Sequence, residues 1–126
     1  MTDIVEVTTA MRFRTEAEWT RHIIDYAEAN GWLVYHVFNS FKRVTSKGFP
    51  DLVCLNSGLM VVAELKMKKR KTGAAVGVSP EQRHWLGEFA KVGLGGFGSL
   101  QVYIWTPDDY EEMEETLSHK RGPSNA

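Results

Sequence analysis

The chain has 126 residues, of which 43% are hydrophobic and 25% are charged, and its formal net charge is −1 at pH 7. This length suits one compact domain with a hydrophobic core and is short for two. The sequence has no apolar run of the roughly 18 to 20 residues that span a bilayer and no signal-peptide pattern at its start, so we expect a cytoplasmic protein with no membrane partner. The single cysteine, Cys54, excludes an intramolecular disulfide and cannot build a zinc site by itself.

The charges are segregated along the chain although their sum is close to zero. The acidic residues gather at 108–115, and the basic residues gather at 42–47 and 66–71. A basic surface favours binding of a polyanion such as DNA, whereas an isolated lysine-rich run can also be a solvated loop. The residues considered for contact with nucleic acid are Lys42, Arg43, Lys47, Lys68, Lys69, Arg70 and Lys71.

In chain order, the first predicted element is a helix that begins after Thr15 and stops at Asn30 and Gly31. Thr15 followed three residues later by Glu18 is the pattern of a capping box. At about 100° per residue, Glu16 falls on the apolar face of this helix and Glu18 on the opposite face. A carboxylate aimed at the core needs a metal, a lysine or backbone amides as its partner, so Glu16 is a candidate site residue.

Three predicted strands follow the helix. Residues 32–38 are rich in aromatic and β-branched side chains and would point His36 inward. The apolar runs 52–55 and 61–66 form the next two strands. The turn residues at 56–58 between these two runs predict a hairpin.

This hairpin would bring three charged side chains together. Residues two apart on a strand project from the same face, so Glu64 and Lys66 point at one site, and Asp51 at the start of the partner strand approaches Glu64. Two carboxylates and a lysine are the minimal set for metal-assisted hydrolysis of phosphodiesters. The alternative interpretation is a surface salt bridge between Glu64 and Lys66 next to an ordinary turn at Pro50 and Asp51.

The rest of the chain predicts a connection, two helices and one strand. Glycines and small residues at 72–78 indicate a mobile connection. A second helix opens at 79–82 with serine as N-cap, proline in the first position and glutamine in the capping-box position, and Gly93 is its predicted C-cap. Residues 100–105 form a last core strand, and 106–109 cap an acidic helix.

The order helix, three strands, helix, strand, helix predicts an α/β fold with a mixed sheet flanked by helices. We expect an N-terminal arm at 1–14, one domain at 15–117 and a disordered tail at 118–126.

Several sequence blocks in this order resemble the VRR-NUC branch of the PD-(D/E)XK nucleases, in its small stand-alone form found in phages and bacteria. The blocks are Thr15-Glu16, Gly31-Trp32, Tyr35-His36, Gly48-Phe49-Pro50-Asp51-Leu52, Glu64-Leu65-Lys66, Ser79-Pro80-Glu81-Gln82 with Trp85, and Val102-Tyr103-Ile104-Trp105. They cover the chain from about Thr15 to Leu117. A Pro-Asp pair with a distant Glu-x-Lys is a weak motif, whereas the ordered series is more specific. One departure is Thr20, which stands where many relatives have a glutamine.

The resemblance implies a restriction-endonuclease-like fold and a metal-dependent endonuclease that hydrolyses DNA. Asp51, Glu64 and the backbone carbonyl of Leu65 would bind Mg²⁺ or Mn²⁺, and Glu16 would complete the site directly or through a water molecule. Lys66 would lie beside the attacking water. The implied catalytic residues are Glu16, Asp51, Glu64, Lys66 and Gln82.

The resemblance also implies a substrate and leaves alternatives open. The chain shows only a nuclease core, which favours recognition of branched or structured DNA by its shape. A two-fold symmetric homodimer could act as a Holliday-junction resolvase, whereas a monomer would be a nickase or flap nuclease. A catalytically silent nucleic-acid-binding module on the same fold is a further alternative. Gln82 equally suits a capping box. An inward histidine on a strand, such as His36, is more often a core residue than a ligand.

Overall fold

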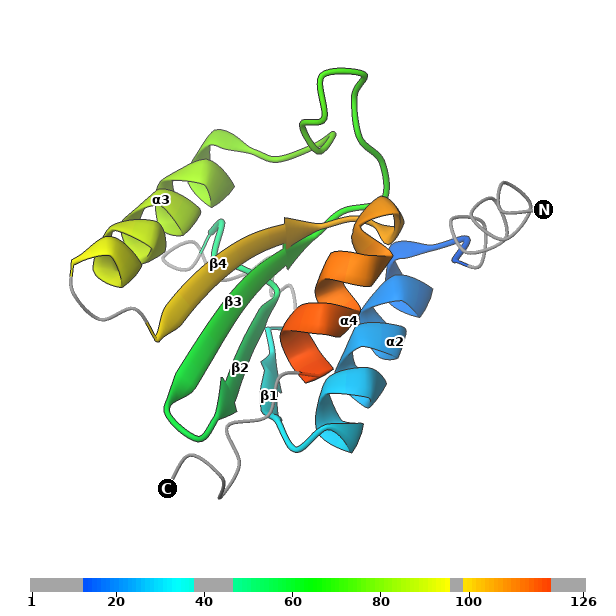
Figure 1. Ribbon diagram of the computed structural model, residues 1–126. Coiled ribbons are helices and arrows are strands. Elements are labelled where there is room, and N and C mark those ends of the chain that lie inside the picture. Colours follow the sequence, from blue (N-terminus) through cyan, green and yellow to red (C-terminus); the bar gives the residue numbers. More distant parts are fainter. Residues whose placement is uncertain (1–12, 38–46, 96–98, 119–126) are drawn as a thin grey trace.

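The computed structural model describes residues 13–37, 47–95 and 99–118. Labelled as in Figure 1, the elements in chain order are the helix α2 (Glu16–Ala29), the strands β1 (Leu33–His36), β2 (Leu52–Asn56) and β3 (Leu59–Leu65), the helix α3 (Pro80–Leu94), the strand β4 (Leu100–Trp105), the 3-10 helix η1 (Pro107–Asp109) and the helix α4 (Tyr110–Ser118). The predicted α/β class is confirmed, because the described part contains a four-stranded mixed sheet with three α-helices.

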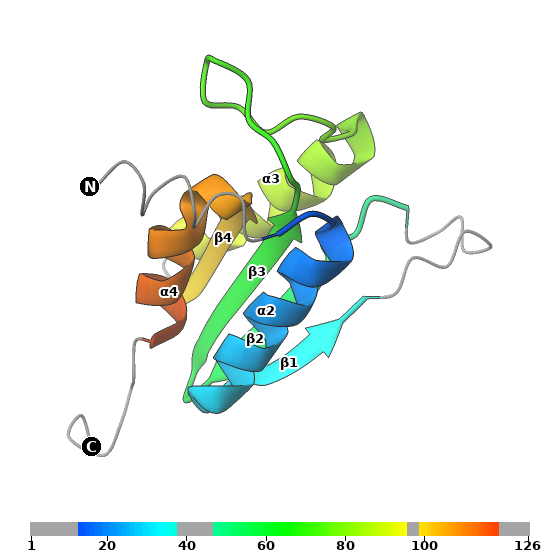
Figure 2. The same cartoon turned by 90° about the vertical axis from the view of Figure 1, so that its right-hand side faces the viewer.

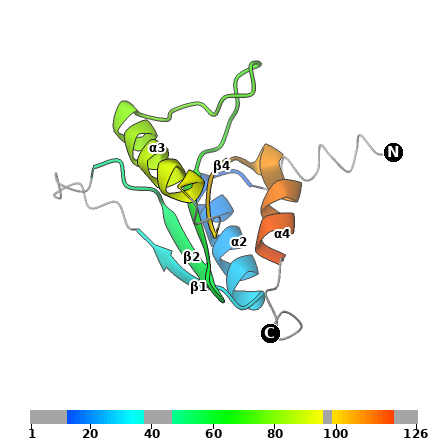
Figure 3. The same cartoon turned by 60° about the vertical axis from the view of Figure 1, so that its left-hand side comes forward.

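The sheet has the order β1-β2-β3-β4. The β1–β2 and β2–β3 pairs are antiparallel, whereas β4 runs parallel to β3. A parallel pair needs a crossover connection, and α3 supplies it. Figures 1 and 3 show α3 on one face of the sheet and α2 with α4 on the other. Helices therefore flank the sheet on both faces, as predicted.

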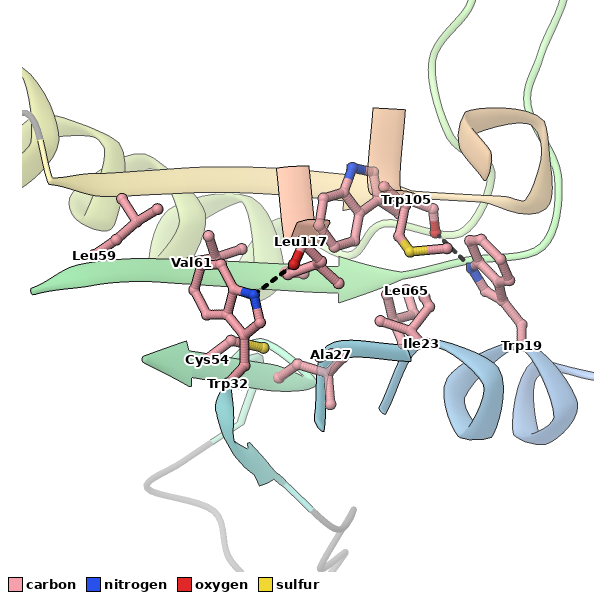
Figure 4. Packing of buried hydrophobic residues seen from close by; sticks show 13 residues of the cluster. Trp19, Ile23, Ala27, Trp32, Cys54, Leu59, Val61, Leu65, Trp105 and Leu117 are labelled. Carbon is pink, nitrogen blue, oxygen red and sulfur yellow. Dashed lines mark hydrogen bonds between the residues drawn. The ribbon is translucent and has the colours of Figure 1, made fainter. Parts of the chain in front are cut away.

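The main hydrophobic core lies between the sheet and the helices α2 and α4. Figure 4 shows the indoles of Trp19, Trp32 and Trp105 among aliphatic side chains of this core. Trp19 Nε1 donates to the backbone oxygen of Trp105 at 3.1 Å, and Trp32 Nε1 donates to that of Leu117 at 2.6 Å. Because buried indoles keep their hydrogen bonds, these contacts fix the beginning and the end of the domain against each other.

The predicted turn and helix starts are confirmed. Ser57 and Gly58 connect β2 to β3 and have φ angles of 50° and 88°. Two turn residues with positive φ match the twist of a tight β-hairpin. The side chains of Thr15 and Ser79 accept hydrogen bonds from amides in the first turns of α2 and α3. The capping box predicted at Thr15 is not completed, because the side chain of Glu18 accepts from the amide of Arg14 instead of Thr15.

Two local predictions are wrong in detail. The helix α3 continues through Gly93 and is capped at Gly95. A Cβ atom at Gly93 would lie 2.6 Å from the backbone oxygen of Leu100, so this glycine lets the helix approach β4 instead of ending the helix. Of the strand predicted at 32–38, the described residues form β1 over Leu33–His36, and residue 38 lies outside the described part.

The predicted domain ends fall partly outside the described residues. The arm at 1–14 is described only from Phe13 onward, and residues 119–126 of the tail lie outside the described part. Ser118 is the last residue of α4 rather than the first of a tail. Its hydroxyl donates to the backbone oxygen of Glu115 at 3.2 Å, as expected within a last helical turn. No helix of the described residues is long and apolar enough to cross a membrane.

Candidate active site

Four elements meet at one end of the sheet. β2 begins and β3 ends there because the two strands are antiparallel. Their register pairs Leu52 with Ala63, so the neighbouring residues Asp51 and Glu64 lie across from each other. Figure 2 shows that α2 and α3 also begin at this end. The site therefore receives side chains from two strand ends and two helix starts.

Asp51 is held by the backbone around it. Its Oδ2 accepts a hydrogen bond from the amide of Leu65 at 2.9 Å, and its own backbone oxygen accepts one from the amide of Val37 at 2.8 Å. The preceding Pro50 is fully buried. These contacts keep the Asp51 carboxylate at the strand end, close to Glu64.

Glu64 is a buried carboxylate, with only 1% of its side chain exposed. Its Oε2 accepts a hydrogen bond from Gln82 Nε2 at 2.8 Å and lies 3.3 Å from Nζ of Lys66. Its Oε1 is buried and has no hydrogen-bond partner among the described residues. Burial and repulsion from Asp51 raise the pKa of Glu64 to about 8, although Lys66 acts in the opposite direction. Further positive charge near Oε1 would stabilise the ionised form.

Lys66 directly follows the last residue of β3, Leu65. Its amide donates to the backbone oxygen of Trp105 at 3.0 Å, which continues the pairing with β4. Its side chain is 15% exposed and contacts Glu64. The prediction that Glu64 and Lys66 point at one site is therefore confirmed, and this ion pair is a buried one rather than the surface salt bridge of the alternative interpretation.

Gln82 forms the predicted capping box and also contacts Glu64, while its catalytic role stays a prediction. Its Oε1 accepts a hydrogen bond from the amide of Ser79 at 2.9 Å, which completes the capping box of α3. This contact requires the oxygen of the side-chain amide, so the NH₂ group faces the other way and donates to Glu64. The helix cap thus orients a donor toward the site.

The loop before Asp51 is clamped to α3 by aromatic side chains. Trp85 Nε1 donates to the backbone oxygen of Lys47 at 3.0 Å, and the rings of Trp85 and Phe49 meet edge to face with centroids 5.0 Å apart. Gly48 has a φ of 89°, and a Cβ there would lie 2.6 Å from the backbone of Glu81. This close approach was not predicted, although the aromatic residues in both segments are a signal for it.

The prediction that Glu16 points into the core is wrong, because the first turn of α2 precedes the buried residues Trp19 and Thr20, and Glu16 and Glu18 are both exposed. Glu16 is the first residue of α2, about one helical turn before the buried Thr20, and its side chain is exposed. Partial burial and repulsion from Asp51 raise the pKa of Glu16, and Lys66 acts in the opposite direction, so Glu16 lies within electrostatic range of the site. Glu18 is exposed and accepts a hydrogen bond from the amide of Arg14 at 2.8 Å.

The oxygen atoms at this site fit a hard divalent cation. Mg²⁺ and Mn²⁺ prefer carboxylate and carbonyl oxygens, and Mg²⁺ is held by one or two carboxylates while it retains several waters. Asp51 and Glu64 supply such carboxylates, and Oε1 of Glu64 is buried without a partner among the described residues. Within the described residues, no group of three or more His, Cys, Asp or Glu side chains could hold an ion by itself. Water-mediated contact to Glu16 and the carbonyl of Leu65 would have to complete the coordination.

The structure separates the predicted basic residues into different groups. Lys69 forms an ion pair with Asp109, so the segregation of charge along the chain does not keep this acidic residue away from the basic run. Lys47 lies 3.7 Å from Glu81 in an exposed pair. Exposed basic residues that form no ion pair with any described residue are Lys68, Arg70 and Lys71. Lys42 and Arg43 lie outside the described residues.

His36 is half-buried at the end of β1, and its Cα lies opposite that of Leu52. This places His36 near the strand end that carries Asp51. Its direct participation in chemistry stays a prediction.

No protein-family model matches the chain, and comparisons with curated proteins and with solved structures also returned no match. Function is therefore inferred from the sequence and from the geometry of the site.

Proposed function

We propose that the protein is a Mg²⁺- or Mn²⁺-dependent endodeoxyribonuclease of the VRR-NUC type, with a restriction-endonuclease-like core, that hydrolyses phosphodiester bonds in branched DNA. The observation that carries the proposal is the environment of Glu64. A buried carboxylate that contacts Lys66 and Gln82, faces a second carboxylate and retains an unused oxygen matches a metal-assisted hydrolytic site. A structural ion pair would not need the second carboxylate.

Different residues of the site would have different roles in the reaction. When bound, the divalent cation would lower the pKa of a water molecule and screen charge on the phosphate. The ammonium group of Lys66 would orient the attacking water and stabilise negative charge that develops on it. The amide of Leu65 would hold Asp51, and Gln82 would hold Glu64, so that both carboxylates are oriented before substrate arrives.

The proposed preference for branched DNA follows from the exposed side chains near the site. Exposed lysine and arginine side chains near the site would contact phosphates, which position DNA without reading its sequence. Selectivity would then come from the shape of the DNA. The outer strand β1 exposes Leu33 by 72% and Tyr35 by 66%, an apolar surface that a second copy of the chain would cover in a homodimer. A dimer favours a four-way-junction resolvase, and a monomer favours a nickase or flap nuclease.

The proposal is tested by incubating the purified protein with a labelled four-way junction, a flap and a linear duplex in Mg²⁺, in Mn²⁺ and in a chelator. We expect cleavage with either ion, preference for a branched substrate and no cleavage in the chelator. Cleavage that persists in the chelator would exclude the proposed mechanism. Binding to DNA without cleavage under any condition would instead support the silent binding module.

A further inference from the structure

The chain between β3 and α3 forms an ordered hairpin at residues 68–76, which we call the basic hairpin. The amide of Val76 donates to the backbone oxygen of Lys68 at 2.8 Å, and the amide of Arg70 donates to that of Ala74 at 2.7 Å. Lys69 and Ala75 pair as an antiparallel bridge between these bonds. Figures 1 and 2 show this segment projecting beyond the end of the sheet. Residues 72–76 of the connection predicted at 72–78 therefore belong to this hydrogen-bonded hairpin.

Lys69 anchors the basic hairpin to the body of the domain. Its Nζ donates to Oδ1 of Asp109, and the two side chains are 29% and 15% exposed. Oδ2 of Asp109 accepts hydrogen bonds from the amide of Thr106 at 2.9 Å and from its hydroxyl at 3.2 Å. Because Asp109 is fixed by this cap, it holds Lys69 in place and neutralises its charge.

The basic residues on either side of Lys69 do not share its contact with Asp109. Side chains alternate along a β-ribbon, so Lys68 and Arg70 project away from the side that carries Lys69. Both are exposed, as is Lys71, and none of the three forms an ion pair with a described residue. The hairpin thus presents uncompensated positive charge on its outer side, two residues beyond Lys66.

The composition of the hairpin indicates which part of a nucleic acid it would contact. Residues 68–76 include no aromatic side chain, and binding of unpaired bases relies on aromatic stacking. Lysine and arginine without such platforms contact phosphates, and a two-stranded β-ribbon is of a size that fits a groove of duplex DNA.

We propose that the basic hairpin is a preformed clamp for the backbone of a duplex DNA arm, docked onto the domain by the Lys69–Asp109 pair. The proposal rests on the proposed function, because it assumes that DNA is the ligand of the neighbouring site. It assigns Lys68 and Arg70 to phosphate contact and Lys69 to the positioning of the hairpin, in contrast to the uniform DNA-contact role predicted from the sequence.

The test measures DNA affinity by fluorescence anisotropy across a range of salt concentrations, in a chelator so that no cleavage occurs. For Lys68→Ala with Arg70→Ala, we expect affinity for duplex DNA to fall about tenfold and the salt slope to become shallower by about 0.9 for each phosphate that the hairpin no longer neutralises. For Lys69→Ala, we expect weaker binding with an unchanged salt slope. Lys91→Ala, which removes an exposed lysine on α3 that pairs with Glu88, is the matched control and should bind as wild type.

The Asp109→Asn variant distinguishes between two roles of Lys69, anchoring the hairpin or contacting phosphate. Asparagine can still accept the hydrogen bonds from Thr106, but it no longer offers Lys69 a negative charge. We expect this variant to bind less tightly, and the Lys69→Ala/Asp109→Asn double variant to bind no worse than the weaker single variant. Tighter binding of Asp109→Asn with a steeper salt slope would show that Lys69 contacts phosphate and would overturn the anchor. An equal loss of affinity for single-stranded DNA in Lys68→Ala with Arg70→Ala would overturn the duplex assignment.

These results are independent of the test of cleavage. Normal duplex binding by the Lys68→Ala, Arg70→Ala variant in a protein that cleaves DNA would refute the clamp and leave the nuclease proposal standing. The expected decreases in affinity in a protein that never cleaves DNA would support the clamp and refute the nuclease proposal.

Discussion

Two capping boxes of this domain share the same local geometry but have different roles. Ser79 with Gln82 opens α3, and Thr106 with Asp109 opens η1 ahead of α4. In each box, a side-chain oxygen of the residue three positions after the N-cap, Gln82 or Asp109, accepts a hydrogen bond from the backbone amide of the N-cap residue. The other atom reaches a different segment: Gln82 donates to Glu64, whereas Asp109 accepts from Lys69.

The difference lies in whether the second contact balances the local charge. Asp109 and Lys69 have opposite charges, and both oxygens of Asp109 are occupied. At the other box a neutral amide meets Glu64, which retains a buried oxygen without a partner among the described residues and has a raised pKa. A balanced contact is typical of structural anchoring, whereas a buried imbalance is typical of a site that binds a further group.

The largest effect should come from Lys66, the only cation that contacts the unbalanced carboxylate in the described part of the site. We expect Lys66→Ala to reduce the rate of cleavage by about 100-fold or more, since it removes a charge next to the reacting phosphate. Single-turnover cleavage at saturating DNA measures this rate. Binding affinity should weaken only modestly, and a variant that cleaves at the wild-type rate would exclude the role of Lys66.

A smaller catalytic effect is expected from Glu16, which lies within electrostatic range of Asp51 and Lys66. Glu16→Gln should slow cleavage by about tenfold or more while it leaves the free energy of unfolding nearly unchanged. Glu18→Gln is the matched control on the opposite face of α2, and it should cost at most about 1 kcal/mol of stability, because glutamine can still accept the hydrogen bond from the amide of Arg14. Equal loss of cleavage in both variants would contradict the assignment by helix face.

Gln82 offers a way to separate the two contacts of one capping box. Gln82→Met removes both the cap acceptor and the donor to Glu64, whereas Gln82→Glu keeps an acceptor for Ser79 and loses the donor. We expect the methionine variant to lose about 1 kcal/mol of stability through the cap. We expect cleavage to be slow in both variants. Wild-type cleavage by Gln82→Glu would show that Gln82 serves only the helix.

A thermodynamic prediction concerns the pH dependence of stability in the absence of divalent ions. The pKa of Glu64 is raised to about 8 in the folded chain from an ordinary value of 4.5, so the protonated folded state is favoured. This contribution to stability is complete below about pH 4.5 and is lost as the pH rises through about 8.

Glu64→Gln mimics the protonated form and should remove this dependence. Urea unfolding in a chelator at pH 5 and at pH 9 should therefore show the variant gaining stability relative to wild type as the pH rises. A constant difference between the two proteins across this range would contradict a raised pKa of Glu64 in the folded protein.

The sequence was informative where a contact depends on neighbours along the chain. The positive-φ turn at Ser57 and Gly58 matches the turn residues that predict the β2–β3 hairpin, and the hairpin with the two-residue spacing brings Asp51, Glu64 and Lys66 together. These features follow from local backbone preferences and from the period of a strand.

The sequence was misleading where a distant segment decides the outcome. Gly93 has the identity of a helix terminator, but its close approach to Leu100 on β4 explains it instead. The Lys69–Asp109 pair joins residues 40 positions apart, and no local pattern selects this lysine from its neighbours. The parallel pairing of β4 with β3 places η1, which carries Asp109, beside the chain that follows β3, and only tertiary packing determines this placement.

The most direct test of the unbalanced site is calorimetric titration with Mn²⁺ in two buffers of different ionisation enthalpy at pH 7. We predict that the wild-type protein binds Mn²⁺ and releases protons as it does so, because Glu64 must be ionised to act as a ligand. We also predict that Glu64→Gln and Asp51→Asn lose this binding, while Asp109→Asn retains it. Absence of Mn²⁺ binding by the wild-type protein, or equal binding by all four proteins, would contradict a divalent-cation site at Asp51 and Glu64.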